Sequence, residues 1–435
     1  MNRILQSPAI AVIGRHNSGK TTLVERLIRR LCSWGVDVGS VKHHGHRGFD
    51  IDIPGKDSFR HRAAGASETF IAAPGQVAMV KTITGEMECS EIIDSMPGHD
   101  VVIVEGYRLS GLPAIEVMRA ENERDMAVAR ALFDNAENAI PLSCDVLQSL
   151  RCRSDDGHGP DLADDLVQKM PGAQVVAIAS DIPLAHEAAR IYGIPSFDID
   201  DANGIAAFIR ERYVRPRLTV AIQAGGESSR MGQSKALVPF LGRPLIARLV
   251  ERLAPVADEL IITTNEPEKL EFLHSWFPNL GIRLVSDECE YRGALPGIYT
   301  ALKAANSPLV GVVACDMVFA SASLVAAEYH RAVEESADIC IPKDLRGMEP
   351  FHALYRRETC LPVCEELLSQ GGKRPQALLD QVKVSYFRRE QLLGIDSEGL
   401  CFVNVNTPDD LVEAERLAVA GARVAEGARH HPGGC

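Results

Sequence analysis

The sequence predicts an α/β protein that consists of two doubly wound domains, each built on a mostly parallel sheet. Three observations lead to this prediction: the chain has 435 residues, short β-branched runs alternate with longer amphipathic stretches, and a glycine-rich loop follows the first apolar run of each half. Domains hold roughly 100–200 residues, so this length favours two of them. Alternation of strands with helices is typical of sheets whose parallel strands are joined by helical crossovers.

Short apolar runs rich in β-branched residues are expected to be buried parallel strands, because helices cover both faces of such a sheet. Strands are expected at residues 10–13, 38–41, 101–104, 175–178, 218–222, 260–264 and 310–314, and helices at residues 23–34, 244–254 and 295–304.

A charged segment with a proline, at residues 210–217, separates the two halves. We therefore expect domains at residues 1–213 and 217–425, followed by a disordered tail at residues 426–435. The most polar stretch, residues 151–165, is expected to be a loop.

The composition restricts the partners. The hydrophobic fraction is 46% and the charged fraction 24%, as in ordinary globular proteins. The net charge of −13 argues against nucleic acid or an anionic membrane as the main partner. A phosphorylated small molecule remains compatible with it, since a local loop can bind phosphate on an acidic protein. The chain has neither a signal-peptide pattern at its N-terminus nor an apolar run near the roughly 20 residues of a membrane span.

The eleven cysteines are scattered and none stands in a Cys-x-x-Cys pair. This usage favours a reduced, cytoplasmic protein. Cys360 and Cys364 would share one helix face and are expected to be packing or surface cysteines rather than metal ligands.

The first glycine-rich loop, GRHNSGKT at residues 14–21, fits the pattern GxxxxGK[ST] in full and lies between an apolar strand and a helix. Backbone N–H groups of such a loop surround phosphate oxygens. Lys20 is expected to reach the β- and γ-phosphates, and the Thr21 hydroxyl to bind Mg²⁺. The candidate nucleotide-binding residues here are Gly14, Asn17, Gly19, Lys20, Thr21 and Thr22.

Two polar groups follow neighbouring strands of this half. Glu105 ends an apolar strand, where a carboxylate can hold the metal directly or through water; the alternative is an acidic strand-end residue without a role. Lys42, His43 and His44 follow another strand and point to the same edge. With His46 these histidines offer a transition-metal alternative, although their spacing matches no standard zinc site.

Several motifs together resemble the MobB family of molybdopterin-guanine dinucleotide biosynthesis. They are the loop at residues 14–21, VKHH at 41–44, DIDIPGKDS at 50–58, VEGY at 104–107 and ASD at 179–181. The resemblance extends over about residues 8–210. It implies a P-loop NTPase-like domain that binds GTP, hydrolyses it weakly and assists a guanylyltransferase, and it suggests a homodimer formed through this domain. A small-molecule kinase is the alternative for this half.

The second glycine-rich loop, QAGGESSRMGQSKAL at residues 223–237, fits neither a dinucleotide fingerprint nor a second P-loop. Gly225 and Gly226 permit close approach of the backbone to a polyphosphate. Arg230 and Lys235 supply two positive charges for a developing negative charge. The residues therefore indicate a site for transfer of a nucleotidyl group, and the alternative is a surface turn with two solvated basic residues.

Polar residues at other strand ends of this half complete the candidate site. Asp316 ends an apolar strand and is the candidate Mg²⁺ ligand, because a hard cation prefers carboxylate oxygen. Asp287 can accept hydrogen bonds from ribose or help to set the metal, and its alternative role is a cap. The segment 263–265 suits base or ribose recognition. Asn404 and Asn406 point the same way along an extended segment, and Asn406 or Thr407 can equally cap the following helix.

These motifs closely resemble the MobA family, the molybdenum cofactor guanylyltransferases, over about residues 218–420. The resemblance implies a Rossmann-like nucleotidyltransferase fold and transfer of GMP from Mg-GTP to the molybdopterin cofactor. Two positions depart from the family pattern: Gln223 stands where leucine is usual, and Val318 where proline is usual. By motif match, GTP would contact Gln223, Ala224, Gly225, Gly226, Lys235, Asp287 and Thr263 or Asn265, Mg²⁺ would bind Asp316, and the pterin would lie near Asn404 and Asn406.

The sequence thus predicts GTP, Mg²⁺ and the molybdopterin cofactor as ligands, and molybdoenzymes or insertion chaperones as acceptors of the product. Three alternatives stay open: a cytidylyltransferase for the same cofactor, a sugar-phosphate nucleotidyltransferase, and a GTPase-type chaperone that only carries the cofactor.

Overall fold

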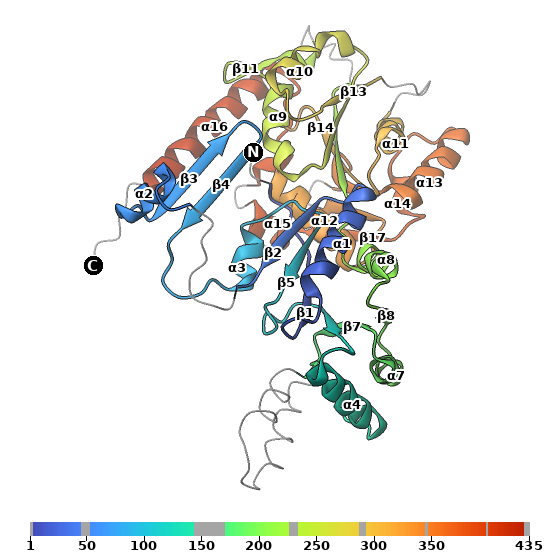
Figure 1. Cartoon of the computed structure of the whole chain (residues 1–435). Coiled ribbons are helices and arrows are strands. Elements are labelled where there is room, and N and C mark those ends of the chain that lie inside the picture. Colours follow the sequence, from blue (N-terminus) through green and yellow to red (C-terminus); the bar gives the residue numbers. More distant parts are fainter. Residues whose placement is uncertain are drawn as a thin grey trace. The chain divides into compact units, whose positions relative to one another are not determined.

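The computed structural model describes residues 3–44, 53–142, 170–225, 234–286, 293–343, 347–396 and 399–429. It divides into two compact units (Figure 1). The N-terminal unit is Gln6–Arg215, and the C-terminal unit is Pro216–Cys435 together with Met1–Leu5. Leu5 is buried in the core of the C-terminal unit, so the first residues of the chain belong to that unit rather than to the one that follows them in sequence.

A six-stranded sheet, in the order β2-β5-β1-β6-β7-β8 and with every pair parallel, forms the centre of the N-terminal unit. Successive side chains of a strand point to opposite faces. Ile10 and Val12 of β1 therefore pack with α1 and α8, and Ala11 and Ile13 pack with α4 and α7. The elements are β1 Ala9–Gly14, α1 Lys20–Ser33, β2 Val38–Lys42, α2 Asp57–Ala63, β3 Glu68–Ala73, β4 Gln76–Lys81, α3 Cys89–Asp94, β5 Val101–Glu105, β6 Ala114–Met118, α4 Glu123–Glu137, β7 Val175–Ser180, α7 Pro183–Tyr192, β8 Ser196–Asp198 and α8 Ala202–Arg212.

Strands β3 and β4 form a separate antiparallel hairpin (Figure 1). Its apolar side chains are largely exposed: Phe70 keeps 63% and Val77 65% of its accessible surface.

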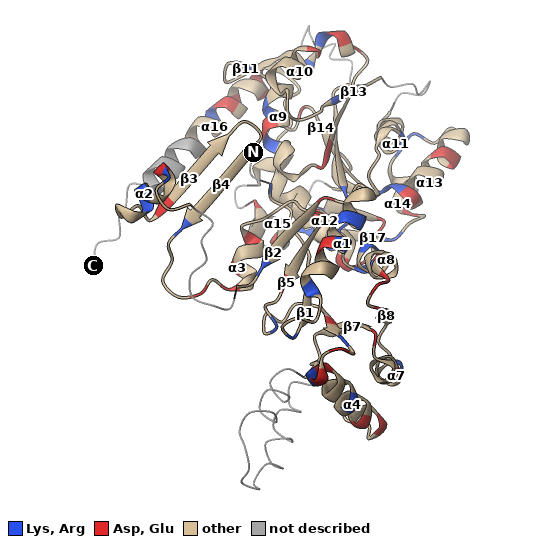
Figure 2. Ribbon diagram, in the orientation of Figure 1, with Lys and Arg blue, Asp and Glu red and all other residues tan. Residues whose placement is uncertain are grey.

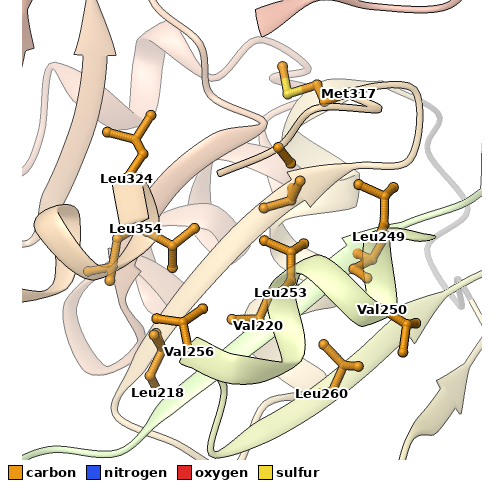
Figure 3. Packing of buried hydrophobic residues seen from close by; sticks show 14 of the residues in the cluster. Leu218, Val220, Leu249, Val250, Leu253, Val256, Leu260, Met317, Leu324 and Leu354 are labelled. Atoms are coloured by element: carbon orange, nitrogen blue, oxygen red, sulfur yellow. The ribbon is translucent and has the colours of Figure 1, made fainter. Parts of the chain in front are cut away.

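The C-terminal unit contains a seven-stranded sheet in the order β13-β12-β9-β14-β16-β15-β17. Only β16 runs antiparallel to its neighbours in this sheet. Leu218 and Val220 of β9 pack against Leu253 of α9 on one face of the sheet (Figure 3), and Ala221 packs with α11 and α13 on the other. The elements are β9 Leu218–Gln223, a 3₁₀ turn Lys235–Leu237, β10 Pro239–Phe240, β11 Arg243–Pro244, α9 Leu245–Leu253, β12 Glu259–Thr263, α10 Phe272–Trp276, β13 Arg283–Val285, α11 Ala294–Ala304, β14 Leu309–Ala314, α12 Ala322–Glu334, β15 Ile339–Lys343, β16 His352–Arg356, α13 Arg357–Ser369, α14 Gln376–Leu379, β17 Val384–Arg388, α15 Arg389–Ile395 and α16 Pro408–Arg429.

The predicted fold class is confirmed, since each unit is a mostly parallel sheet covered by helices on both faces. Most predicted strand and helix ends differ from the observed ones by one to three residues. Helix α1 begins at Lys20 instead of residue 23, β12 ends at Thr263, and α16 continues to Arg429 through the start of the expected tail. Residues 151–165 and 430–435 lie outside the described residues.

Cys360 and Cys364 are buried on α13, and burial raises the pKa of each thiol to about 12. Both therefore stay protonated and pack as small apolar groups. Lys and Arg are interspersed with Asp and Glu on α4 and α9 (Figure 2). No helix among the described residues is long and apolar enough to cross a membrane.

Candidate functional site

The carboxyl ends of three parallel strands meet at one edge of the C-terminal sheet. Gln223 of β9 pairs with Thr263 of β12 on one side and with Ala314 of β14 on the other. A cavity of about 510 Å³ opens at this edge, where ligands of open α/β sheets bind. Of the predicted site residues, the structure brings these to its wall: Gln223, Ala224, Gly225, Lys235, Thr263, Asn265, Asp316 and Asn404.

Lys235 lies at the centre of the polar contacts in this cavity. Its Nζ donates to Asp316 Oδ2 at 3.2 Å and to Asn406 Oδ1 at 2.6 Å. About a quarter of the Lys235 side chain and 22% of the Asp316 side chain are exposed. The cation and the carboxylate are thus partly desolvated yet open to a ligand in the cavity.

The segment that carries the two asparagines is attached directly to the loop of Asp316. Met317 pairs with Asn404, and the backbone N–H of Val405 donates to the Asp316 carbonyl at 2.9 Å. Asn406 therefore reaches Lys235, while the hydroxyl of Thr407 accepts from the Asp410 N–H at 3.2 Å. Thr407 therefore caps the helix, and Asn406 contacts Lys235.

The neighbouring loop is held against β12. The Ala224 N–H donates to the Thr263 carbonyl at 2.8 Å, and Asn265 Nδ2 donates to the Gly225 carbonyl at 3.4 Å. These bonds fix the start of the glycine-rich loop at the cavity wall. The predicted residues Gly226, Arg230 and Asp287 lie outside the described residues.

The rest of the cavity wall is formed by residues that were not predicted from the sequence to belong to the site. Gly293 and Gly297 at the start of α11, and Glu349 and Phe351 before β16, line the cavity. The two glycines stand in the segment GALPG, residues 293–297, where α11 begins. Glu349 and Phe351 carry no local signal, because only the antiparallel pairing of β16 with β14 brings them there.

In the N-terminal unit the loop between β1 and α1 has the expected backbone form. Asn17 and Gly19 have positive φ angles of 62° and 85°. A Cβ on Gly14 would lie 2.6 Å from the Val117 carbonyl oxygen, so only glycine fits there. Lys20 Nζ donates to the Arg15 carbonyl across the loop. Burial lowers the pKa of the Lys20 amine, and the Glu105 carboxylate opposes this shift.

Thr21 and Glu105 meet as their positions predict. The Thr21 hydroxyl donates to Glu105 Oε1 at 2.7 Å, and Lys42 Nζ lies 3.0 Å from the same oxygen. Thr22 is exposed next to them. His43 contacts Glu86 at 2.6 Å, and the described residues contain no cluster of three His, Cys, Asp or Glu side chains able to hold a metal. His46 lies outside the described residues.

A buried charged pair behind this loop has no local sequence signal. Both oxygens of Glu116 on β6 accept from Arg108, at 2.7 and 2.6 Å. Nearby, burial raises the pKa of Asp125, and the Arg119 backbone N–H that donates to its carboxylate at 3.1 Å opposes the shift. Glu116 is 2% exposed and Asp125 is 1% exposed. Both carboxylates are therefore shielded from solvent behind the loop.

Both places offer oxygen atoms suited to Mg²⁺, which prefers carboxylate and hydroxyl ligands. At the cavity of the C-terminal unit they are the carboxylate of Asp316 in its wall and, bonded to the same Lys235, the side-chain oxygen of Asn406. In the N-terminal unit they are the Thr21 hydroxyl and Glu105, which already lie within hydrogen-bond distance. The donor sets therefore fit the ion that a nucleotide would bring.

Comparison with known proteins finds a family model that matches each of the two units. The family model described as molybdopterin guanine dinucleotide synthesis protein B matches residues 9–135, and that of the MobA-like NTP transferase domain matches residues 220–384. The molybdenum cofactor guanylyltransferase of Desulfosudis oleivorans is 32% identical over 205 residues, which are 47% of this chain and 97% of that protein.

Two further relatives match the same half. The molybdenum cofactor guanylyltransferase of Vibrio cholerae is 31% identical over 194 residues, covering 44% of this chain and 88% of that protein. Among solved structures, the molybdopterin-guanine dinucleotide biosynthesis protein A of Archaeoglobus fulgidus is 28% identical, with a TM-score of 0.41, and the match covers 46% of this chain and 99% of that one.

Proposed function

The chain belongs to the molybdenum cofactor guanylyltransferase family through its C-terminal half, and from this premise we propose that it transfers the guanylyl group of GTP to the molybdenum cofactor. A phosphate oxygen of the cofactor forms a bond to the α-phosphorus of GTP. The bond from that phosphorus to the oxygen bridging to the β-phosphate breaks, and pyrophosphate leaves. The product is molybdopterin-guanine dinucleotide.

One observation carries the proposal: Lys235 lies in a nucleotide-sized cavity between Asp316 and Asn406. Transfer of a nucleotidyl group needs positive charge beside the phosphates as negative charge develops on them. Lys235 supplies that charge on a side chain whose position is already fixed by two hydrogen bonds. Ala224, Gly225, Thr263 and Asn265 form the wall against which the rest of the nucleotide binds.

We assign Mg²⁺ to Asp316. When bound, the ion would neutralise charge on the phosphates of GTP. The carboxylate is reachable from the cavity, and the adjacent Asn406 oxygen offers a second hard ligand. Lys235 keeps the carboxylate in place before the substrate enters.

Proton removal needs no protein base in this reaction. A phosphate monoester has a second pKa near 6, so the attacking oxygen is already ionised at neutral pH. The neighbouring Cys315 is not a base or nucleophile, because burial raises the pKa of its thiol to about 12.

For the N-terminal unit we propose a GTP-binding domain that assists the transferase and hydrolyses GTP slowly. Its support is the loop at Gly14–Lys20 together with the contact between Thr21 and Glu105. Glu105 would hold Mg²⁺ with Thr21, and Lys20 would turn from the Arg15 carbonyl to the phosphates. Phosphoryl transfer to the molybdenum cofactor, which the kinase alternative requires, is not expected.

The transferase is tested by incubating the full chain with Mg-GTP and molybdenum cofactor and detecting the dinucleotide by mass. GTP is expected to be the preferred donor over CTP and UTP, and Lys235→Ala is expected to remove the product. Lys303→Ala is the matched control, because Lys303 is exposed on α11 of the same unit. A preference for CTP would reject guanylyl transfer, and full pyrophosphate release by Lys235→Ala would favour a cofactor chaperone.

We also propose two partners of the chain: a protein that accepts the dinucleotide, and a second copy of the chain itself. The dinucleotide is passed to a molybdoenzyme or its insertion chaperone. The N-terminal unit forms a homodimer, which the exposed apolar side chains Phe70 and Val77 of the β3–β4 hairpin support. Light scattering should give twice the chain mass for the wild type and the single mass for Phe70→Ser with Val77→Ser.

A further inference from the structure

Gln223 carries an unused hydrogen-bond donor at the wall of the cavity. Its side-chain nitrogen, Nε2, is buried and has no hydrogen-bond partner among the described residues. Leaving a buried N–H unpaired costs roughly 1–3 kcal/mol, so such a group in a ligand cavity points to a partner that arrives with the ligand.

The carboxamide is held in place by the helix opposite. It lies so close to Gly297 of α11 that a Cβ on that residue would be 2.6 Å from Oε1 and 3.0 Å from Nε2 of Gln223. The backbone of Gln223 is fixed as well, because its carbonyl accepts from the Cys315 N–H at 2.9 Å. The donor therefore lies between the end of β9 and the first turns of α11.

The order of the strands indicates which part of the substrate this donor meets. Lys235, Asp316 and Asn406 gather at the end of β14, where the phosphates belong. Gln223 ends β9, the next strand. Beyond it Thr263 ends β12, and Asn265 follows that strand. A nucleotide with its phosphates at Lys235 would place its base on the β9–β12 side of the cavity.

We propose that Gln223 donates its side-chain N–H to the carbonyl oxygen O6 of the bound guanine, and thereby selects a 6-oxo base against a 6-amino base. This inference rests on the proposed function. A carbonyl satisfies the buried donor, whereas a 6-amino group would bring a second donor against it and leave both unpaired. A leucine at this position would offer no such bond.

The pterin ring of the cofactor also has a carbonyl oxygen that can accept a hydrogen bond. The experiment therefore distinguishes guanine from pterin as the partner of the Gln223 donor. Dinucleotide formation is measured with GTP and with 2,6-diaminopurine riboside triphosphate, which has an amino group in place of O6. The wild type, Gln223→Leu and Gln223→Glu are compared. The ratio of kcat/KM for GTP to that for the analogue should fall about tenfold in Gln223→Leu. It should reverse in Gln223→Glu, whose carboxylate accepts from an amino group and repels a carbonyl.

Ratios within twofold of the wild type in both variants would overturn the inference. So would an unchanged ratio with a raised KM for the cofactor, because that result would assign the donor to the pterin ring. Folding is checked by the thermal midpoint, which Gln223→Leu should not lower, since leucine removes the unpaired donor.

Failure of the proposed function is recognised separately. If the wild type makes no dinucleotide from any triphosphate, guanylyl transfer is rejected, and the Gln223 contact is then tested by equilibrium binding of the two triphosphates. That measurement uses the full chain with Lys20→Ala, so that it reports the C-terminal cavity. Equal affinity of this protein for both nucleotides would reject the contact itself.

Discussion

Lys235 Nζ lies 3.2 Å from Asp316 Oδ2, although the two residues are 81 positions apart and come from different loops of the C-terminal sheet. The same amine donates to Asn406, 171 positions away. Three segments thus converge on one cation at the edge of the cavity. The charge that nucleotidyl transfer requires is in place before any substrate binds, which is how preorganised electrostatic stabilisation works.

Lys235→Ala should lower the turnover number for dinucleotide formation by about 10²–10³-fold, the usual effect of removing one preorganised group that stabilises the transition state. The KM for GTP should rise less, because other contacts hold the nucleotide. Steady-state kinetics with Lys303→Ala as the control checks this. An undiminished turnover number would show that Lys235 is only structural.

Asp316→Asn should lower turnover about 100-fold and raise the Mg²⁺ concentration needed for half-maximal activity, since a neutral amide is a weaker ligand for a hard cation. Titration of Mg²⁺ at saturating GTP measures this. Asp380→Asn, at an exposed position after α14, should titrate as the wild type does. An unchanged Mg²⁺ requirement in Asp316→Asn would place the ion elsewhere.

Lys20→Ala should remove GTP from the N-terminal loop, because the amine is then missing from the phosphates. Calorimetric titration should show that the stoichiometry falls from about two nucleotides per chain to about one, with loss of the slow hydrolysis. Arg29→Ala, at an exposed position on the same helix, should keep both sites. Two occupied sites in Lys20→Ala would contradict the assignment of the loop.

Gly297→Ala should change the preference between the two nucleotides without lowering the stability of the unit. Alanine inside α11 should stabilise the unit by about 0.5–1 kcal/mol in the absence of other effects. The new methyl group would meet the Gln223 carboxamide at 2.6 Å, so the carboxamide must move. The preference for GTP over the 6-amino analogue should fall, and the thermal midpoint should not. An unchanged preference would mean that the carboxamide does not meet the base.

Glu328→Gln should change how the stability of the C-terminal unit depends on pH. Burial raises the pKa of the Glu328 carboxyl to about 7, and the facing His352, whose Nδ1 is 3.4 Å away, opposes the shift. An unfolded carboxyl titrates near 4.3. The folded state therefore binds the proton more tightly than the unfolded state does. The stability that this difference contributes is fully present below about pH 4 and is lost as the pH rises through about 7.

Glutamine mimics the protonated acid at every pH, so Glu328→Gln should gain stability relative to the wild type between pH 5 and 8, by on the order of 2–3 kcal/mol. Denaturation followed by the fluorescence of Trp276, in a Trp34→Phe background, reports the C-terminal unit, since these are the two tryptophans of the chain. Glu334→Gln, exposed on the same helix, is the control. A difference that does not vary with pH would show that the carboxyl titrates normally.

The sequence by itself determined the strands, the glycine-rich loops and the polar residues at the strand ends. These are local features: a buried parallel strand is a short apolar run, and a loop that approaches phosphate needs glycine. Glu105 ends β5 and Asp316 lies two residues after β14, because each comes at the end of such a run. The fold class followed from the same pattern, because alternating strands and helices permit few arrangements.

Only the tertiary structure decided which of these residues meet. The contact of Lys235 with Asn406, the choice of Thr407 as the cap, and the approach of Gln223 to Gly297 depend on strand order and on the crossovers between strands. The strand order is the one that lets both faces of each sheet be buried at once. It depends on contacts between residues far apart in the sequence, so no short segment encodes it. The burial of Leu5 in the C-terminal unit has the same origin, and so does the buried pair of Arg108 with Glu116.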